Sequence, residues 1–330
     1  METILVTELE FSKAAEIFRG VKDVQCKPAP ADEAALAEAV ASSGARAVIV
    51  GVAPYRGPLY EALAKQSGAI IARFGVGHDS INKTLARLRG IVVTNTPGVL
   101  DISVAEHTMW LMGCLVRKIV RQETRLRSGT FACEVGMELH GKTLGILGFG
   151  GIGRRVATMA NAGFGMKVIA CSRHAPAEPP ARFGVGHFTT SVEELFRASD
   201  IVSIHLPVNA DTQRFINAAR LAWLKPGAML INTARGAVLD EEALYDALTS
   251  QRLAGAALDV FVCEPYAPIH PGKDLRTLDN VVLTPHTGSN TSEANRRMAE
   301  AALENVRCFF AGKTDRLARV DIPVSGNTGK

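Results

Sequence analysis

The amino-acid sequence predicts an α/β protein made of two doubly wound parallel-sheet domains. Short apolar runs typical of buried strands alternate with helical patterns along almost the whole chain, as parallel sheets covered by helices require. The chain has 330 residues, 47% of them apolar, which is enough material for two cores rather than one. Near the middle, one apolar run ends in a glycine cluster that opens a helix, a junction typical of doubly wound sheets.

The first domain begins at the N-terminus and extends to residue 100. Apolar runs and the helical patterns between them predict strands at 4–7, 47–50, 69–73 and 91–94 and helices at 32–43 and 60–66. Thr96-Pro97-Gly98 breaks this pattern, and a long helix is predicted from 103 to 128. The heptapeptide A-R-F-G-V-G-H occurs at 72–78 and again at 181–187. Only the first copy follows an apolar strand, so we interpret the second as a loop without a role.

The second domain, residues 101–288, repeats the alternation. Its predicted strands are 144–147, 166–171, 200–206, 228–233, 256–261 and 281–284. Three further helices are predicted in this domain. The first covers 154–161, the second follows a capping box formed by Ser191 and Glu194, and the third runs from Asp240 to 251. A last helix at 291–311 is expected to return to the first domain, which then comprises 1–100 plus 289–330, with 320–330 as a polar tail. No flexible linker separates the domains, so we expect short hinges and a cleft between them.

The glycine cluster predicts a dinucleotide site. Gly148, Gly150 and Gly153 form a G-x-G-x-x-G motif between a strand and a helix, with Gly151 and Ile152 in the same turn. Glycines let the backbone approach a pyrophosphate at the positive N-terminus of the helix. The second, larger domain is therefore predicted to be a Rossmann-type dinucleotide-binding domain.

The next strand indicates which dinucleotide binds. It ends at Ser172 and Arg173, where an NAD-binding fold carries an acid for the ribose 2′-hydroxyl. A hydroxyl followed by a guanidinium would instead accept a 2′-phosphate. We predict that NADP(H) is preferred and that NAD(H) is possible; the alternative is that Arg173 is an ordinary solvated arginine.

The bulk composition excludes several classes of protein. The formal charge of +4 comes from 37 basic and 33 acidic residues scattered along the chain, so we expect no nucleic-acid partner. No apolar run approaches the roughly 20 residues of a membrane span, and the N-terminus lacks signal-peptide features. Six cysteines without a C-x-x-C pair argue against a zinc site or a disulfide framework. We expect a cytoplasmic protein with no metal and no membrane partner.

Three polar residues follow successive strands of the second domain: Arg235, Glu264 and His286. Open parallel sheets bind ligands at the carboxyl ends of their strands. A guanidinium could hold a substrate carboxylate, and an imidazole could exchange a proton with the adjacent carbonyl oxygen. The carboxylate would orient the imidazole and stabilise its protonated form. Alone, each has a structural alternative: an ion-pairing arginine, a loop-bonding histidine or a surface glutamate.

These residues and motifs resemble those of the D-isomer-specific 2-hydroxyacid dehydrogenases. The resemblance is carried by segments that span most of the chain in family order: 73–79, 95–98, 103–107, 148–153, 232–236, 258–265 and 284–288. It implies the same roles for Arg235, Glu264 and His286. It also implies a homodimer in which the helix after Pro97 packs against the second subunit. The further cofactor contacts that it implies are Val104, Leu206, Pro207, Thr212, Thr233, Ala234 and Asp259. It also implies that Val76 and Gly77 offer backbone N–H groups to the substrate carboxylate.

Departures within the family narrow the prediction. Formate dehydrogenases carry glutamine where Glu264 stands, and the Ser172-Arg173 pair is similar to that of NADPH-using glyoxylate/hydroxypyruvate reductases. We therefore expect a reductase of small 2-oxo acids, with glyoxylate or hydroxypyruvate as substrate and a D-2-hydroxy acid as product. The alternatives are a D-3-phosphoglycerate dehydrogenase, for which Arg56 is the candidate phosphate contact, and a D-lactate-type dehydrogenase. A non-enzymatic alternative is a dinucleotide-sensing scaffold.

Overall fold

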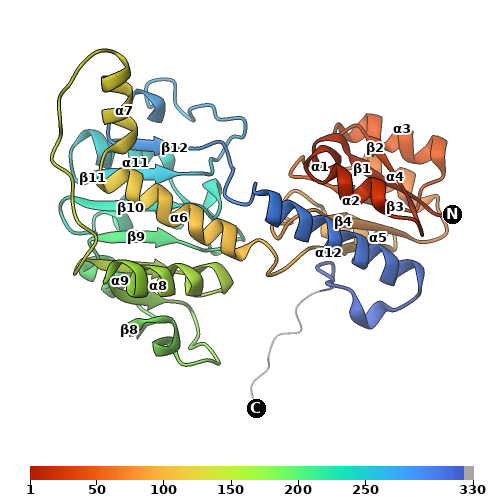
Figure 1. Cartoon of the computed structure of the whole chain (residues 1–330). Coiled ribbons are helices and arrows are strands. Elements are labelled where there is room, and N and C mark those ends of the chain that lie inside the picture. Colours follow the sequence, from red (N-terminus) through yellow and green to blue (C-terminus); the bar gives the residue numbers. More distant parts are fainter. Residues whose placement is uncertain (323–330) are drawn as a thin grey trace. The chain divides into compact units, whose positions relative to one another are not determined.

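The chain, described over residues 1–322 by a computed structural model (Figure 1), divides into two compact units. Unit 1 comprises Met1–Leu100 and the chain from Asn290 onward, and unit 2 comprises Asp101–Ser289. The sequence analysis placed the point where the chain returns to the first domain one residue earlier, after residue 288. Each unit is built around its own sheet.

Unit 1 contains a five-stranded parallel sheet in the order β2-β1-β3-β4-β5. Its strands are β1 (Thr3–Thr7), β2 (Gln25–Ala29), β3 (Ala47–Val50), β4 (Ala69–Arg73) and β5 (Ile91–Thr94). Its helices are α1 (Glu8–Lys13), α2 (Ala15–Gly20), α3 (Glu33–Ser43), α4 (Pro58–Ala64), α5 (Lys83–Leu88) and α12 (Ser292–Phe310), followed by a 3-10 turn η4 (Thr314–Arg316). Every residue of β3 and β4 is buried, as expected for parallel strands covered on both faces. The last helix, α12, packs on β4, so it belongs to the first unit, to which the sequence analysis expected it to return.

Unit 2 contains a seven-stranded parallel sheet in the order β12-β11-β10-β9-β6-β7-β8. Its strands are β6 (Thr143–Leu147), β7 (Lys167–Cys171), β8 (Val185–Thr189), β9 (Ile201–Ile204), β10 (Ala228–Asn232), β11 (Leu253–Leu258) and β12 (Val281–Leu283). Its helices are α6 (Asp101–Val116), α7 (Ile119–Arg127), α8 (Gly151–Phe164), α9 (Val192–Ala198), α10 (Ala218–Leu221) and α11 (Glu241–Thr249), with 3-10 turns η1 (Pro180–Phe183), η2 (Gly236–Val238) and η3 (Leu275–Thr277). The order from β8 to β11 is that of a dinucleotide-binding doubly wound sheet, with its reversal between β6 and β9.

The strand ends of unit 2 lie level with one another. Residue pairing places Leu147 beside both Cys171 and Ile204, Asn232 beside Ile204 and Leu258, and Leu258 beside Leu283. The residues that follow these strands therefore share one edge of the sheet. This register collects side chains that are far apart in the sequence.

Local sequence signals explain where several helices of both units begin. Asp32, Ser191, Asp240 and Thr291 each accept a hydrogen bond from a backbone amide three residues on, so they cap α3, α9, α11 and α12. The predicted capping box at Ser191 is only half formed. Glu194 bonds Thr189 and His187 instead of returning to the amide of Ser191.

Several elements were missed or misplaced by the sequence analysis. Strands β2 and β8 and helices α1, α2, α5 and α10 were not predicted. The second A-R-F-G-V-G-H copy is not a plain loop, since it forms most of η1 and begins β8. The predicted helix 103–128 is two helices, α6 and α7, separated at Lys118, whose φ of 53° is left-handed. Val320 of the expected tail donates to the Val93 carbonyl, and residues 323–330 lie outside the described chain.

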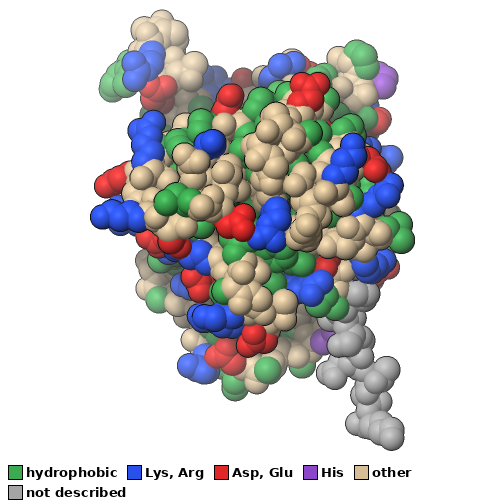
Figure 2. Space-filling view, turned by 90° about the vertical axis from the view of Figure 1, so that its right-hand side faces the viewer, with side chains coloured by type: hydrophobic (Ala, Val, Ile, Leu, Met, Phe, Trp, Pro, Cys, Tyr) green, Lys and Arg blue, Asp and Glu red, His purple; other side chains and the backbone are tan. Residues whose placement is uncertain are grey.

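Acidic and basic side chains are interspersed on the face shown in Figure 2, without a continuous basic stripe on that face. No helix within residues 1–322 combines the length and apolar character needed to cross a membrane.

Candidate active site and cofactor site

The glycine loop at the end of β6 is shaped by close backbone contacts. Gly148 has a φ of 100°, and a Cβ there would collide with the His205 carbonyl. A Cβ on Gly153 would collide with the Gly148 carbonyl, and one on Gly151 would collide with the Asp101 carboxylate. A Cβ on Gly150, by contrast, would meet no atom within 4 Å.

This loop fits a pyrophosphate. Gly150 is the N-cap of α8 and provides no side-chain cap, so the first amides of the helix lack a side-chain acceptor there. Ile152 is half-buried, and Ala157 lies fully buried on the inner face of α8, where its small side chain permits close packing. The residues that could hold a dinucleotide phosphate are therefore the amides at the start of α8.

Ser172 and Arg173 follow β7 on the same sheet edge as this loop. Ser172 Oγ donates to the His174 carbonyl at 2.7 Å. The Arg173 side chain is 72% exposed and pairs with Asp211 at 3.2 Å. Exposed pairs of this kind contribute about 0–1 kcal/mol, so Arg173 can exchange Asp211 for another anion at little cost.

Leu206 and Pro207 follow β9, the strand next to β6. Thr212 is buried and closes this loop: its Oγ1 donates to the Pro207 carbonyl at 2.6 Å and accepts from the Asn209 amide at 2.8 Å. The Thr212 hydroxyl is thus engaged by the loop itself.

The turn after β10 presents Thr233, Ala234 and Arg235. Buried Asn232 clamps it, accepting from the Ala234 amide and donating to the Arg235 carbonyl, both at 3.0 Å. Arg235 is half-buried, and one of its guanidinium nitrogens donates to the Ala234 carbonyl at 2.7 Å.

Gly236 brings this turn against the loop after β11. A Cβ on Gly236 would collide with the backbone of Phe261, so only glycine permits this approach. The Glu241 carboxylate reinforces the contact by accepting from the Val262 amide at 2.7 Å. The role of Gly236 was missed by the sequence analysis, although its place directly after Arg235 could have suggested it.

His286 and Glu264 form a close pair. Nδ1 of His286 lies 2.7 Å from Oε2 of Glu264, whose other oxygen accepts from the Phe261 amide at 3.0 Å. Because a carboxylate only accepts, the His286 proton must sit on Nδ1 in the neutral ring. The second nitrogen, Nε2, is then the one that can take up and give back a proton.

Electrostatics favour an ionised Glu264. Burial raises the pKa of its carboxyl, but the hydrogen bond and charge of His286, the Phe261 amide and the charge of Arg235 together lower that pKa below its usual value. Arg235, Glu264 and His286 therefore belong to one electrostatic cluster at the carboxyl edge of the sheet.

Asp259 follows β11 and is buried at 1% exposure. Burial raises its pKa, yet hydrogen bonds from His107, Thr284 and the amides of Thr287 and Gly288 lower the pKa of its carboxyl overall. The part played by His107 was not predicted. Its signal was present, because Val104, His107 and Thr108 share one face of a helix at spacings of three and four residues.

In unit 1, the loop after β4 presents Val76 and Gly77. The carbonyls of Gly75, Val76 and Gly77 accept from the Thr96 amide, the Asn95 side chain and the Arg73 guanidinium at 3.1, 2.8 and 2.9 Å. The amides of Val76 and Gly77 donate to no atom within residues 1–322. Two neighbouring donors of this kind suit an anion.

The neighbouring loop that contains Arg56 is held by Glu33. The carboxylate of Glu33 accepts from the backbone amides of Arg56 and Gly57, each at 2.8 Å.

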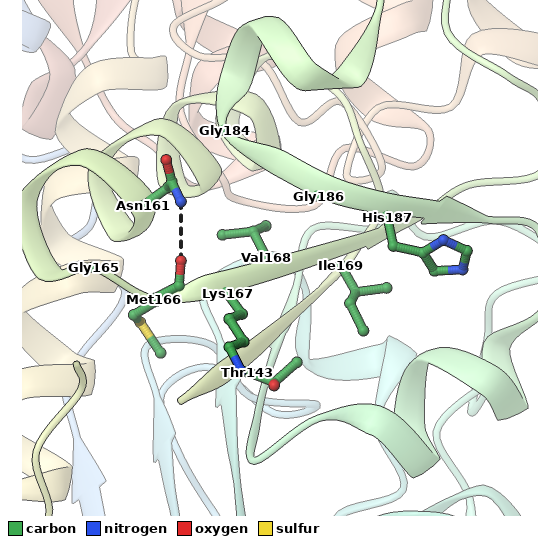
Figure 3. Close-up of a pocket in the computed structure, with 10 residues that line it drawn as sticks. All are labelled: Thr143, Asn161, Gly165, Met166, Lys167, Val168, Ile169, Gly184, Gly186 and His187. Carbon is green, nitrogen blue, oxygen red and sulfur yellow. Dashed lines mark hydrogen bonds between the residues drawn. The ribbon is translucent and has the colours of Figure 1, made fainter. Parts of the chain in front are cut away.

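A hollow also lies at the opposite, amino edge of the unit 2 sheet. It is lined by the first residues of β6 and β7 and by β8, and Asn161 donates there to the Met166 carbonyl at 3.0 Å (Figure 3). None of the predicted site residues lines it. Within the described chain, no three His, Cys, Asp or Glu side chains are grouped to hold a metal ion.

Comparison with known proteins gives one consistent result. The family model "D-isomer specific 2-hydroxyacid dehydrogenase, NAD binding domain" matches residues 109–288. A hydroxypyruvate reductase of Thermotoga maritima is 43% identical over 243 residues, covering 72% of this chain and 76% of that protein. A glyoxylate reductase of Thermococcus litoralis is 44% identical over 253 residues, 74% of each chain.

A solved structure extends the similarity over almost the whole fold. The NADPH-dependent glyoxylate/hydroxypyruvate reductase of Sinorhizobium meliloti, crystallised with NADP and malonate, superposes with a TM-score of 0.81 at 30% identity. The match covers 97% of this chain and 96% of that one.

Proposed function

Because the chain belongs to the D-isomer-specific 2-hydroxyacid dehydrogenases, oxidoreductases that use a nicotinamide cofactor, we propose that it reduces glyoxylate or hydroxypyruvate to the D-2-hydroxy acid, with NADPH preferred. The observation that carries this proposal is the His286–Glu264 pair in one electrostatic cluster with Arg235. The reductase names of the similar proteins from Thermotoga and Thermococcus support the substrate class.

In the proposed mechanism, Arg235 binds the substrate carboxylate through its planar guanidinium and polarises the adjacent carbonyl. When bound, the reduced nicotinamide supplies the hydride that the carbonyl carbon accepts. His286 donates the Nε2 proton to the carbonyl oxygen, so that C=O becomes CH–OH. Glu264 keeps Nδ1 protonated and stabilises the imidazolium that must form before each turnover.

The residues proposed to hold the cofactor follow the strand ends in order. The amides of the N-cap Gly150 and of Gly151, Ile152 and Gly153 in α8 would bind the pyrophosphate. Leu206, Pro207 and Thr212 would line the adenosine side. Val104, Thr233, Ala234 and Asp259 would seat the nicotinamide. Val76 and Gly77 are proposed as further donors to the substrate carboxylate, supported by their two unengaged amides among the described residues.

The preference for NADPH rests on Ser172 and Arg173, which leave the end of β7 without an acid. The reductase of Sinorhizobium meliloti, which is NADPH-dependent by name, is a structural relative that supports it. The test compares kcat/KM for NADPH and NADH with one 2-oxo acid. A higher value for NADH would overturn the preference while leaving the reaction class intact.

Purified protein tests the reaction. We expect oxidation of NADPH in the presence of glyoxylate or hydroxypyruvate, with slower turnover of pyruvate and bulkier 2-oxo acids. His286→Gln is the matched control, and its kcat should fall by about two decades or more because the general acid is lost. Binding of NADPH without turnover of any 2-oxo acid would favour the scaffold alternative.

We also propose that the chain forms a homodimer through α6, α7 and the segment that follows. Phe131 and Val135 on this segment are 94% and 90% exposed, and Trp110 on α6 is 71% exposed. Glu134 fastens the segment to α7 through Lys118, Arg121 and Arg125. Large exposed apolar side chains on an ordered scaffold are typical of an interface.

Light scattering tests the dimer. The double variant Phe131→Asp with Val135→Asp should run as a monomer, while Leu88→Asp, a change at another exposed apolar side chain, in unit 1, should leave the mass unchanged. A monomeric parent protein would contradict the proposal. Six unpaired cysteines further support a reducing compartment, so we propose a cytoplasmic enzyme.

A further inference from the structure

We propose that His107 is a positioning residue that orients the Asp259 carboxylate, holding one oxygen so that the other can accept a hydrogen bond from the nicotinamide carboxamide. The inference rests on the proposed function, because it takes Asp259 as a nicotinamide contact. His107 itself is not a catalytic residue, since it acts through Asp259.

The two oxygens of Asp259 are used unequally. Oδ1 accepts from Thr284 Oγ1 at 2.6 Å and from the Thr287 amide at 2.8 Å, and His107 Nε2 lies 3.3 Å from it. Within residues 1–322, Oδ2 accepts only from the Gly288 amide, at 2.8 Å. A carboxylate oxygen has two lone pairs, so Oδ2 retains one for a ligand.

The positions of the protons shared by Asp259, Thr284 and His107 follow from the fact that the Asp259 carboxylate can only accept hydrogen bonds. Thr284 Oγ1 gives its only proton to Asp259, so it must accept from His107, whose Nε2 is 3.1 Å away. His107 Nε2 therefore carries a hydrogen shared between Thr284 and Asp259. Removing it would take a donor from both groups at once.

The surroundings of Oδ2 suit a flat amide. A Cβ placed on Gly288 would lie 3.0 Å from Asp259 Oδ2, 3.5 Å from His107 Cδ2 and 3.7 Å from Val104 Cγ1. A Cβ there would crowd the carboxylate, so glycine keeps this side of Oδ2 unobstructed, next to the imidazole edge and an apolar side chain. A carboxamide needs one acceptor for its N–H group and apolar contact for its plane, and both are present here.

A structural role alone is the competing explanation, because His107 also ties α6 to the strand ends. The two explanations differ in which ligand they affect. Misorientation of Asp259 weakens only ligands that carry a nicotinamide ring, whereas a loosened α6 weakens every ligand that binds the sheet edge.

The experiment measures calorimetric dissociation constants without substrate. The ligands are NADPH and 2′-phospho-ADP-ribose, which lacks the nicotinamide, with NADH and ADP-ribose as the parallel pair. His107→Ala should weaken NADPH binding about tenfold, the effect of losing one hydrogen bond to a charged group. Binding of 2′-phospho-ADP-ribose should stay within about twofold of the parent value.

Two further variants keep the test decisive. His107→Gln retains a side-chain N–H donor and should recover part of the lost NADPH affinity. Met112→Ala removes a fully buried side chain from the same helix without contacting Asp259, so it should lower thermal stability and leave the ratio of the two constants unchanged.

If His107→Ala weakens the binding of NADPH and of 2′-phospho-ADP-ribose equally, His107 has a merely structural role and the inference is overturned. Binding of NADPH as tight as in the parent protein would also overturn it. A parent protein that binds the dinucleotides but turns over no 2-oxo acid would refute the proposed function, and the two ratios would still decide the role of His107. A parent protein that binds neither dinucleotide overturns both proposals.

Discussion

His286 has a φ of 54°, in the left-handed region that residues other than glycine rarely adopt. Such a conformation costs on the order of 1–3 kcal/mol and persists only where its surroundings impose it. Here the His286 amide donates to the Asp259 carbonyl at 2.8 Å, and the ring bonds Glu264. The imidazole is therefore held from both its backbone and its side chain, which is what a proton donor in a fixed place requires.

Arg235 is the residue that we propose to bind the substrate carboxylate. We expect Arg235→Ala to raise KM for the 2-oxo acid and to lower kcat, because the carboxylate would lose both its anchor and its charge partner. Arg235→Lys should recover only a small part, since an ammonium lacks the planar fork. Steady-state kinetics check this, and a parent-like KM in Arg235→Ala would remove Arg235 from carboxylate binding.

At the scale of one side chain, Ser172 is the residue that we propose to favour NADPH over NADH. Ser172→Asp should lower kcat/KM for NADPH and raise kcat/KM for NADH. The reason is that a carboxylate repels the 2′-phosphate and can accept a hydrogen bond from the 2′-hydroxyl. Ser172→Ala is the control, since it removes the hydroxyl without adding charge. An unchanged cofactor ratio in Ser172→Asp would place the 2′-phosphate elsewhere.

At the scale of elements, the site depends on how closely the strand ends approach one another. The turn after β10 and the loop after β11 meet backbone to backbone at Gly236, and the Glu241 carboxylate bonds the same loop. Arg235 and Glu264 come from these two connections. Their proximity is thus a property of the pairing of β10 with β11 and not of either loop alone.

Gly236→Ala tests this close approach. The added methyl would collide with the Phe261 backbone, so we expect a destabilisation of about 1–3 kcal/mol. Gly163→Ala is the matched control, because it lies in α8 with open space around it and should be neutral or stabilising by up to about 1 kcal/mol. Urea unfolding monitored by circular dichroism compares the two. Equal effects would show that the Gly236 contact has no energetic weight.

At the scale of the whole molecule, each unit is complete in its own sheet and core, and the proposed catalytic cluster belongs to unit 2 alone. Titratable side chains of unit 2 that lose contact with water on folding make the stability of the protein depend on pH. Burial lowers the pKa of His205 to about 4, whereas an unfolded histidine titrates near 6.5. The unfolded chain therefore binds an extra proton between these values.

The direction of the pH dependence of stability follows from the difference between the folded and unfolded pKa values of His205. His205 contributes its full stability above about pH 6.5 and loses it progressively as the pH falls toward about 4, by at most about 1.4 kcal/mol per unit. The lowered pKa values of the Asp259 and Glu264 carboxyls act in the same direction, but below about pH 4, where unfolded carboxyls take up protons. Burial raises the pKa of the Asp101 and Glu241 carboxyls, which acts in the opposite direction at the acid end of this range. The histidine is therefore identified by the difference between the parent curve and that of a His205 variant.

Thermal melts between pH 4 and 7.5 test this, with about 6.5 as the turning point. The parent Tm should fall steadily below that point, and His205→Gln should flatten the decline. The control is His174→Gln, a change at an exposed histidine, which should follow the parent curve. Parallel curves for the parent and His205→Gln would show that His205 does not carry the dependence.

Much of this arrangement could be predicted because strands and helices leave local signatures. The apolar runs of β3, β4 and β6 and the glycines after β6 predict their own conformations, as do the caps at Asp32 and Asp240. Strand β2 was missed because only one of its five residues is buried, so it lacks the apolar signature. The break at Lys118 was missed because helix patterns on its two sides run on without a glycine or proline.

The sequence by itself therefore determined the class of fold, the two sheets and the polar residues that end their strands, since each depends on short-range patterns. Only the tertiary structure decided which of those residues meet. The bond between His286 and Glu264, the approach of Gly236 to Phe261 and the grip of His107 on Asp259 join residues 22 to 152 positions apart in the sequence. Contacts over such distances arise from strand pairing and helix packing, which no local pattern encodes.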